Sequence, residues 1–321
     1  MKLSVIIPVL NEQDSIDHLI SQLNSYFLQQ QHYCTEVIFV NDGSTDRTAY
    51  KLKTGKHLYY SAKVISFSRN FGAHAALRAG IQYATGDYIT FMYADLQDPV
   101  ELVEMLLTEI ETKDICWAFR NSTKVSKTEK VFSRVYAYLM RKYAVSNFPK
   151  KGFDIVMFSR KVQDYLNSNI ESNSSVFIQI LSLGYKQTAV TYNRNARLVG
   201  KSKWTLSKKI KLFIDSFVAF SFAPIRMVSI MGIIFFFLGI VWTGYIVFRK
   251  LVFNDLASGW PALISILMVG FGVTNISLGI LAEYLWRTLD ASRKRPPFVI
   301  DEVADIFTKS EHISEPKVHY Q

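Results

Sequence analysis

The chain has 321 residues, 49% of them hydrophobic, and a formal net charge of +10. Its two cysteines, Cys34 and Cys116, form no Cys-x-x-Cys pair or Cys/His cluster, which excludes a disulfide framework and a zinc finger. Positive charge favours anionic partners. Because no nucleic-acid-binding signature is present, we expect lipid and phosphorylated substrates as partners rather than nucleic acid.

The first hundred residues alternate β-rich runs with helical patterns. Four strands are predicted, at Leu3–Val9, Glu36–Val40, Lys63–Phe67 and Asp87–Met92. The intervening helices are expected to start at Asp14 or Ser15, to start again at Asp46, and to span Ala73–Ala84. Strands that alternate with crossover helices predict an α/β fold with a mostly parallel, Rossmann-like sheet. The first strand is too short for the apolar core of a signal peptide, so we expect this domain to stay in the cytosol.

Beyond these strands the pattern is less regular. Residues 99–143 look helical apart from the polar stretch 121–130, and residues 152–192 are mixed. With the first sheet they are expected to complete one globular domain over residues 1–200.

Two apolar runs, residues 227–249 and 261–286, are each long enough to cross a bilayer core of about 30 Å as a helix. Residues 201–226 before them are basic, with apolar residues at helical spacing. This segment is either an amphipathic helix on an anionic membrane surface or a helix packed in the globular core. Lysine and arginine are denser outside the pair than in its short link, so both flanks, including the tail 287–321, are expected in the cytosol. The sequence therefore predicts an integral membrane protein with two spans and both termini cytoplasmic.

Polar residues follow each of the four predicted strands, at the end where ligands bind in parallel sheets. They are Asn11 and Glu12 after the first strand, Asn41 to Ser44 after the second, Ser68 to Asn70 after the third, and Asp95, Gln97 and Asp98 after the fourth. Four loops that converge on one edge predict a binding site there.

Asp95 is the strongest candidate for catalysis. A hard cation such as Mg²⁺ takes one or two carboxylates plus phosphate oxygens, and it neutralises a departing diphosphate. Asp98 precedes Pro99 and is expected to cap a helix. Asp42 has two interpretations that the sequence does not separate. It accepts hydrogen bonds from a nucleoside, or it forms a turn with Gly43 at positive φ.

Cationic residues gather between the sheet and the apolar runs. They are Arg120, Lys130, Arg194, Arg197, Lys201 and Lys203. Arginine forks suit phosphate, and the run Gly200–Trp204 comes just before the first apolar helix, where a lipid phosphate would lie. The alternative is a general attraction to anionic headgroups.

Six short segments carry a family resemblance. They are Val5–Glu12, Val40–Asp46, Ser68–Gly72, Ala94–Pro99, Gly200–Trp204 and Lys294–Phe298. They resemble the motifs of the family 2 glycosyltransferases, which have the GT-A fold. With the two apolar runs, the layout resembles the polyprenyl-phosphate hexosyltransferases, the group of bactoprenol glucosyltransferase and dolichol-phosphate mannose synthase. The resemblance covers nearly the whole chain and is specific for the family rather than for the sugar.

The resemblance implies a role for each motif. The nucleotide-sugar would be held by Pro8, Asn11, Glu12, Asp42, Ser44, Arg69 and Gly72. An Mg²⁺ or Mn²⁺ ion would be held by Asp95 and Gln97, and the catalytic acids would be Asp95 and Asp154. The lipid phosphate would be bound by Arg120, Lys130, Ser133, Arg197, Ser202 and Lys203. The resemblance also implies inversion at the anomeric carbon, a uridine nucleotide, and a homo-oligomer, specifically a tetramer.

Two departures from the family pattern fall at this site. Tyr93 stands where the family has an acid two residues before Asp95, and a phenol is a poor Mg²⁺ ligand beside a carboxylate. Around Asp154 the chain reads Gly152-Phe153-Asp154-Ile155-Val156, where the usual pattern has glycine directly before the acid and arginine two residues after it. These departures predict altered metal use and an unusual sugar.

The leading hypothesis is transfer of a hexose from a nucleotide-sugar to a polyisoprenyl phosphate of the undecaprenyl type, giving a lipid-linked donor for cell-surface glycan modification. One alternative is direct glycosylation of a glycerolipid or a growing polysaccharide. The other is a non-catalytic membrane scaffold that binds nucleotide-sugar or lipid, which Tyr93 favours. A processive polysaccharide synthase would have a Gln-x-x-Arg-Trp motif and more spans, and the sequence has neither.

Overall fold

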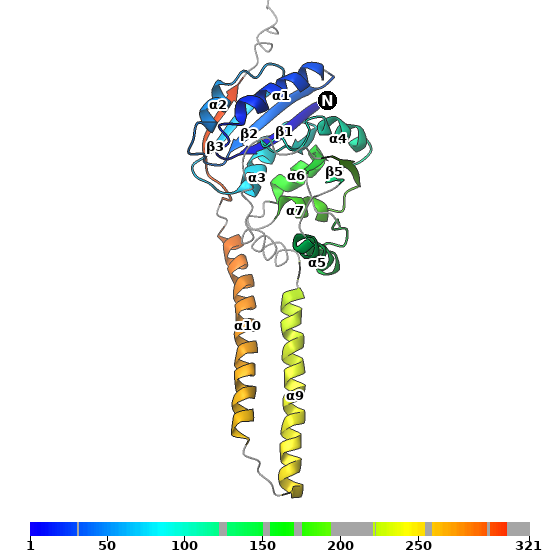
Figure 1. The fold of residues 1–321 in the computed structure, drawn as a ribbon, viewed down its shortest axis with the longest axis vertical. Coiled ribbons are helices and arrows are strands. Elements are labelled where there is room, and N and C mark those ends of the chain that lie inside the picture. The colour runs from blue at the N-terminus through cyan, green and yellow to red at the C-terminus, as the bar shows by residue number, and fades with distance from the viewer. Residues whose placement is uncertain are drawn as a thin grey trace, which may run out of the picture.

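The computed structural model describes residues 1–30, 32–121, 127–149, 155–169, 175–193, 221, 223–253, 259–293 and 296–306. Its core is an eight-stranded sheet with the order β7-β5-β6-β4-β1-β2-β3-β8. The strands are β1 Lys2–Val9, β2 Cys34–Asn41, β3 Ser61–Phe67, β4 Tyr88–Phe91, β5 Ile115–Arg120, β6 Ile155–Ser159, β7 Gln187–Tyr192 and β8 Ile300–Ile306. The helices are α1 Ile16–Gln29, α2 Thr48–Thr54, α3 Ala73–Tyr83, α4 Leu102–Ile110, α5 Lys127–Tyr143, α6 Arg160–Ser168, α7 Val176–Ser182, α9 Ala223–Phe253 and α10 Trp260–Ser292. Figure 1 shows the sheet domain at one end of two long helices.

The first four strands form the parallel half of the sheet. β1 pairs in parallel with both β2 and β4, and β2 pairs in parallel with β3. These strands confirm the predicted, mostly parallel α/β sheet, with bounds within two residues of those expected. Successive strand side chains point to opposite faces, so Val5 and Ile7 enter one apolar layer and Ile6 enters the other. Helices α1, α2 and α4 pack in the first layer, and α3, α6 and α7 pack in the second.

The second half of the sheet differs from the sequence prediction. Residues 115–120, predicted to be helical, form β5, which pairs antiparallel with β6 and parallel with β7. The helical prediction for this stretch is wrong because its short apolar run fits a buried strand as well as a helix. Cys116 and Trp117 are both buried, on opposite faces, as in a strand covered on both sides.

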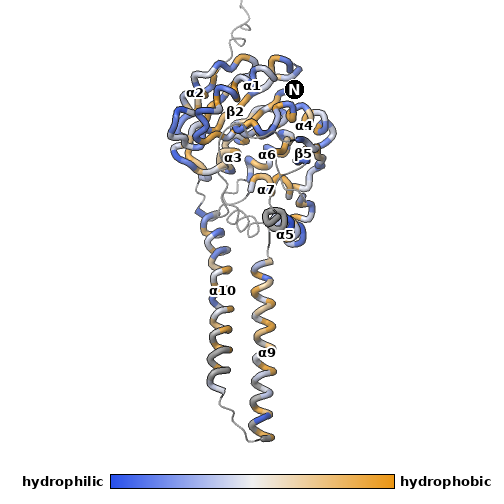
Figure 2. The backbone as a smooth tube through the Cα atoms, viewed as in Figure 1, coloured by the Kyte–Doolittle hydropathy of each residue, from blue (hydrophilic) through white to orange (hydrophobic). Residues whose placement is uncertain are grey.

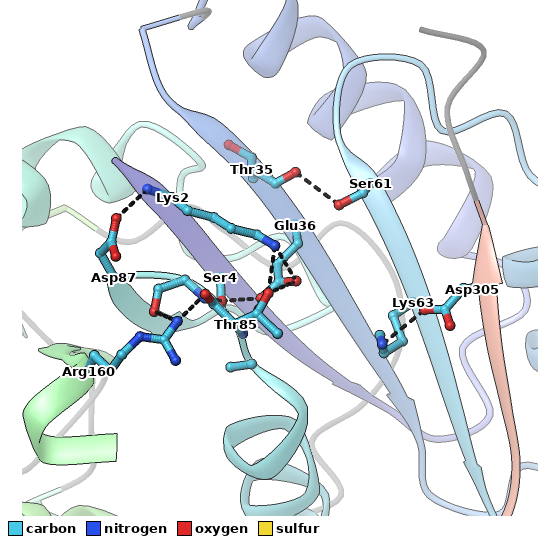
Figure 3. A network of polar contacts seen from close by, with 12 residues as sticks. Lys2, Ser4, Thr35, Glu36, Ser61, Lys63, Thr85, Asp87, Arg160 and Asp305 are labelled. Atoms are coloured by element: carbon cyan, nitrogen blue, oxygen red, sulfur yellow. Dashed lines mark hydrogen bonds and ion pairs between the residues drawn. The ribbon is translucent and has the colours of Figure 1, made fainter. Parts of the chain in front are cut away.

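A polar network holds the amino ends of the central strands (Figure 3). Glu36 of β2 is 6% exposed and accepts hydrogen bonds from the Ser4 hydroxyl and from the Thr85 N–H and hydroxyl. Lys2 Nζ forms an ion pair with Glu36 at 3.3 Å, and Arg160 donates to the Thr85 and Gly86 carbonyls. Burial by itself raises the pKa of Glu36, but the hydrogen bonds and Lys2 outweigh it, so the pKa lies below its ordinary value. The network lies at the strand ends opposite those where ligands were predicted to bind.

Two long helices leave the domain and return to it. Tyr284 of α10 donates from its hydroxyl to the Ser221 carbonyl at 2.8 Å, so the domain ends of α9 and α10 are adjacent. Within the described residues, Ala223–Arg249 is the one helix long and apolar enough to cross a membrane (Figure 2). The chain after α10 then forms β8, antiparallel to β3 at the edge of the sheet. The sequence had placed these residues in a tail and gave no sign of a strand there. The predicted amphipathic segment 201–226 lies mostly outside the described residues.

Candidate functional site

The predicted binding residues gather at one edge of the sheet. The carboxyl ends of β1, β2, β3 and β4 lie side by side because these strands are parallel neighbours. β1 lies between β2 and β4, so the order of strands reverses there, which is the position where open α/β sheets form a ligand crevice. We call the loops at these four strand ends the rim.

The rim loops after β1 and β2 are joined by reciprocal hydrogen bonds. The Asn11 N–H donates to Ser44 Oγ at 3.0 Å, and the Thr45 N–H donates to Asn11 Oδ1 at 2.9 Å. The Glu12 N–H donates to the Thr48 hydroxyl at 2.9 Å. Asn11 has a φ of 49°, in the left-handed region that asparagine tolerates. The structure therefore brings Asn11, Glu12 and Ser44 together, as predicted for nucleotide-binding residues.

Asp42 joins the loops after β2 and β3. Its side chain is buried, and Oδ1 accepts from the Phe71 N–H at 2.7 Å, while both oxygens accept from the Gly72 N–H at 3.2 and 3.0 Å. Burial raises the pKa of Asp42, and the two backbone donors offset part of that rise. Gly43 has a φ of 68°, so the predicted turn is present. The contact with a nucleoside stays a prediction. Pro8 lies in β1, opposite Val40 of β2.

The loop after β3 carries the remaining predicted donor residues. Arg69 is exposed, and its guanidinium lies over the Phe71 ring, 4.0 Å from the centroid. Gly72, at a φ of 98°, precedes the first residue of α3. Arg69 and Gly72 thus lie beside Asp42, and their exposed neighbours Ser68 and Asn70 complete the loop.

The loop after β4 carries the predicted metal ligands. Asp95 and Gln97 are half-buried, and the Gln97 N–H donates to Asp95 Oδ1 at 3.3 Å. Leu96 between them has a φ of 53°, an uncommon conformation for a branched aliphatic residue, which suggests that the loop path is imposed by its surroundings. Within the described residues no group of three His, Cys, Asp or Glu could hold a metal ion. The Asp95 carboxylate by itself fits a magnesium ion that takes its other ligands from a diphosphate and water.

Asp98 does not cap a helix as predicted. Helix α4 starts only at Leu102, and the buried Asp98 carboxylate instead accepts a hydrogen bond from the Tyr192 hydroxyl at 2.6 Å. Arg120 is the register partner of Tyr192 at the ends of β5 and β7. The structure therefore places Arg120, a predicted lipid-phosphate residue, at the same edge as the β4 loop. Nothing in the sequence indicated this role for Tyr192, because its hydrogen-bonding partner Asp98 is 94 residues away along the chain.

Two groups of predicted site residues lie away from the rim loops or outside the described part of the chain. Asp154, Arg197, Ser202 and Lys203 lie outside the described residues, as do Arg194 and Lys201. Lys130 and Ser133 both belong to α5, and the Ser133 side chain is exposed. Their assignment to the lipid phosphate stays a prediction.

His74 is a site feature that the sequence did not indicate. It lies in the first turn of α3, and its ring meets the Phe177 ring edge-on at a centroid distance of 6.0 Å. Its Nδ1 is buried and has no hydrogen-bond partner within the described part of the chain. Burial, with a smaller contribution from the nearby Arg78 charge, lowers the pKa of His74 to about 4. The ring is therefore neutral near pH 7.

Comparison with known proteins places these features in context. The family model described as Glycosyl transferase family 2 matches residues 4–181, more than half of the chain. An uncharacterized glycosyltransferase, YkcC of Bacillus subtilis, is 33% identical over 95% of both chains. The prophage bactoprenol glucosyl transferase homolog of Escherichia coli is 30% identical over 94% of this chain and 99% of its own. The bactoprenol glucosyl transferase of Shigella phage SfV is 30% identical over 94% and 98%.

Similarity to solved structures is weaker. A glucosyl-3-phosphoglycerate synthase of Mycobacterium tuberculosis matches with a TM-score of 0.46 and 20% identity, over 68% of this chain and 76% of its own. This similarity is too low to carry an inference about ligands.

Proposed function

The chain belongs to glycosyl transferase family 2, and we propose that it transfers a hexose from a UDP-sugar to a polyisoprenyl phosphate with inversion at the anomeric carbon. The proposal rests on one observation above all. β8 begins eight residues after α10 ends, and its first residue pairs with the last residue of β3, beside the rim. The rim therefore lies close to the end of α10 at which the chain returns to the domain. A lipid phosphate at a membrane surface there would be near a donor bound at the rim. Relatives named bactoprenol glucosyl transferase point to the same class of acceptor.

The chemistry requires positioning more than proton transfer. A phosphate monoester is largely an anion at neutral pH, since its second pKa is about 6. Its oxygen attacks the anomeric carbon in line, the carbon–oxygen bond to the diphosphate breaks, and UDP leaves with the bonding electron pair. A divalent cation, held by Asp95 with Gln97 beside it, would supply charge stabilisation for the departing diphosphate. Arg120, at the same edge of the sheet, would supply a cation for the phosphate acceptor.

The arrangement of the helices supports two membrane spans. If α9 crosses the bilayer, α10 must cross back, because β8 after α10 belongs to the same sheet as β1 to β4 before α9. Apolar side chains are exposed along α10, including Leu263, Phe271, Ile276 and Leu285, and a bilayer would cover them. The parallel strands and β8 then lie on one side of the membrane, and the charge bias favours the cytosol for that side.

Helix α5 fits this orientation. Figure 1 places it at the end of the domain from which the two long helices leave. Val135, Tyr138 and Tyr143 are exposed on α5, beside the exposed cations Arg134 and Lys142. Aromatic and basic side chains of this kind are common at the headgroup level of membranes.

The test is transfer of radiolabelled sugar from UDP- and GDP-sugars to undecaprenyl phosphate, with Mg²⁺, Mn²⁺ or EDTA. We expect a glycolipid that mild acid cleaves, formed only with metal, and reduced at least about 100-fold in Asp95→Asn if the metal stabilises the leaving group. Asp164→Asn, an exposed acid on α6 away from the rim, is the matched control and should keep full activity.

Other outcomes favour the alternatives. A glycolipid that survives mild acid and forms on a glycerolipid would replace the phosphate acceptor in the proposal. Tight UDP-sugar binding without any product would favour the scaffold hypothesis, which Tyr93 supports by its poor fit to a metal.

A further inference from the structure

The segment that follows α10 contacts the loop after β3 directly. We call this loop, residues 68–72, the donor loop. Ile300 of β8 is the register partner of Phe67, the last residue of β3. The Ser68 N–H, where the donor loop begins, donates to the Val299 carbonyl at 3.1 Å. The chain thus returns from the long helices and fixes the start of a loop that carries Arg69 and Gly72.

A row of aromatic rings continues this connection. The Phe298 ring is 8% exposed and stacks on the Phe67 ring, with centroids 5.1 Å apart and planes 10° apart. Phe67 in turn meets Phe71 edge-on at 5.7 Å, and the Arg69 guanidinium lies on the Phe71 ring. Offset-stacked and edge-to-face pairs are the preferred aromatic geometries, so each contact restricts the next ring.

The row ends at Asp42, which is a predicted nucleotide-sugar-binding residue. The Phe71 N–H donates to Asp42 Oδ1 at 2.7 Å, and the adjacent Gly72 N–H donates to both Asp42 oxygens. Residues 68–70 of the loop are exposed, so packing of their own side chains does not hold them in place. Besides the backbone contacts with Asp42 and Gly43, the position of the loop therefore depends on Phe67 and Phe71, and through Phe67 on Phe298.

We propose that Phe298 is a positioning residue for nucleotide-sugar binding, acting through Phe67 and Phe71 on the loop that carries Arg69 and contacts Asp42. In this role Phe298 would act through its neighbours rather than by a contact with the donor. The inference rests on the proposed function, because the rim must bind a nucleotide-sugar for the loop position to matter. It also connects the segment after the second long helix to the donor site.

The test compares Phe298→Ala with Ile306→Ala in the full-length protein. Phe298 lies two residues before β8, and Ile306 is the last residue of β8, where it pairs with β3 and packs against the core at the other end of the strand from the donor loop. UDP affinity is measured by calorimetry, and the KM for UDP-sugar and kcat by sugar transfer. We expect Phe298→Ala to weaken UDP binding and raise the KM for UDP-sugar roughly ten-fold, the upper end of what one aromatic pair contributes, with a smaller change in kcat. Ile306→Ala should leave both values near wild type.

Two results separate the inference from the function on which it rests. If wild type binds UDP and Phe298→Ala binds it no more weakly than Ile306→Ala, the positioning role is refuted while the proposed function stands. If wild type neither binds UDP nor transfers sugar, the proposed function itself fails. Should Phe298→Ala fail to fold, Phe298→Leu keeps the apolar volume without the ring. It should raise the KM in the same direction, and a KM equal to that of the control would refute the role.

Discussion

Replacing Gly43 by alanine should displace the loop after β3 and so disrupt the rim. An added Cβ would lie 2.4 Å from the Arg69 carbonyl carbon and 2.7 Å from the Asn70 nitrogen. Ordinary contact starts at 3.4 Å, and the opposing atoms are backbone, so the loop after β3 must move by about an ångström. That movement would pull the Phe71 and Gly72 amides away from Asp42.

The magnitude has two parts. A left-handed φ costs a residue with a Cβ roughly 1–2 kcal/mol, and lost hydrogen bonds to a buried carboxylate cost about 1.5–3 kcal/mol each. We expect Gly43→Ala to lose roughly 4–8 kcal/mol of unfolding free energy if both amides are lost, or to keep its fold with a displaced loop and at least about ten-fold weaker UDP binding. Chemical denaturation and calorimetry measure the two quantities.

Gly184 supplies a matched control. It has a φ of 71°, close to that of Gly43, but a Cβ there would meet nothing within 4 Å. Gly184→Ala should therefore show the backbone strain alone, about 1–2 kcal/mol, with unchanged UDP binding. If Gly43→Ala and Gly184→Ala lose the same stability and bind UDP equally well, the contact between Gly43 and the donor loop is not what positions the rim.

Three further predictions concern charge. Glu36→Gln should lower the unfolding free energy by about 2–3 kcal/mol, because the charge that strengthens the hydrogen bonds from Ser4 and Thr85 is lost. Since the pKa of Glu36 is lowered in the folded state, wild type should lose this stabilisation as pH falls below the ordinary value of 4.5, and the variant should not. His74 has a folded pKa of about 4, below its ordinary 6.5, so the unfolded state takes up its proton first. Wild type should lose about 2 kcal/mol between pH 7 and pH 5 in denaturation experiments, and His74→Gln should flatten that slope. Tyr93→Asp adds a second carboxylate beside Asp95 and should tighten Mn²⁺ binding at least about ten-fold in a titration with UDP present, whereas unchanged affinity would place the metal elsewhere.

The pattern of the sequence was sufficient for the parallel half of the sheet. β1 to β4 follow from short β-branched runs that alternate with helical segments, because apolar periodicity and crossover connections leave few other arrangements. The rim followed as well, since parallel strands bring their carboxyl ends to one edge. Asn11, Ser44 and Asp42 are therefore close together in the structure, as the sequence indicated.

Local pattern failed where long-range contacts decide the structure. The run Ile115–Arg120 fits a helix or a strand by itself, and it is a strand because β6 and β7 provide its hydrogen-bonding partners. The sequence predicted that Asp98 caps a helix, but its carboxylate accepts a hydrogen bond from the Tyr192 hydroxyl, 94 residues away in sequence. Neither partner can be identified from neighbouring residues.

The sequence by itself determined the family, the parallel sheet and the rim loops, and it predicted two membrane spans, of which the described residues give one helix long and apolar enough to cross a membrane. These depend on periodicity, on motif spacing and on the composition of continuous segments, which are all local properties. Only the tertiary structure decided that the chain after α10 returns as β8 and that Phe298 stacks on Phe67. The physical reason is that an edge strand and a ring stack are stabilised by partners more than 200 residues away in sequence, and no local propensity encodes them.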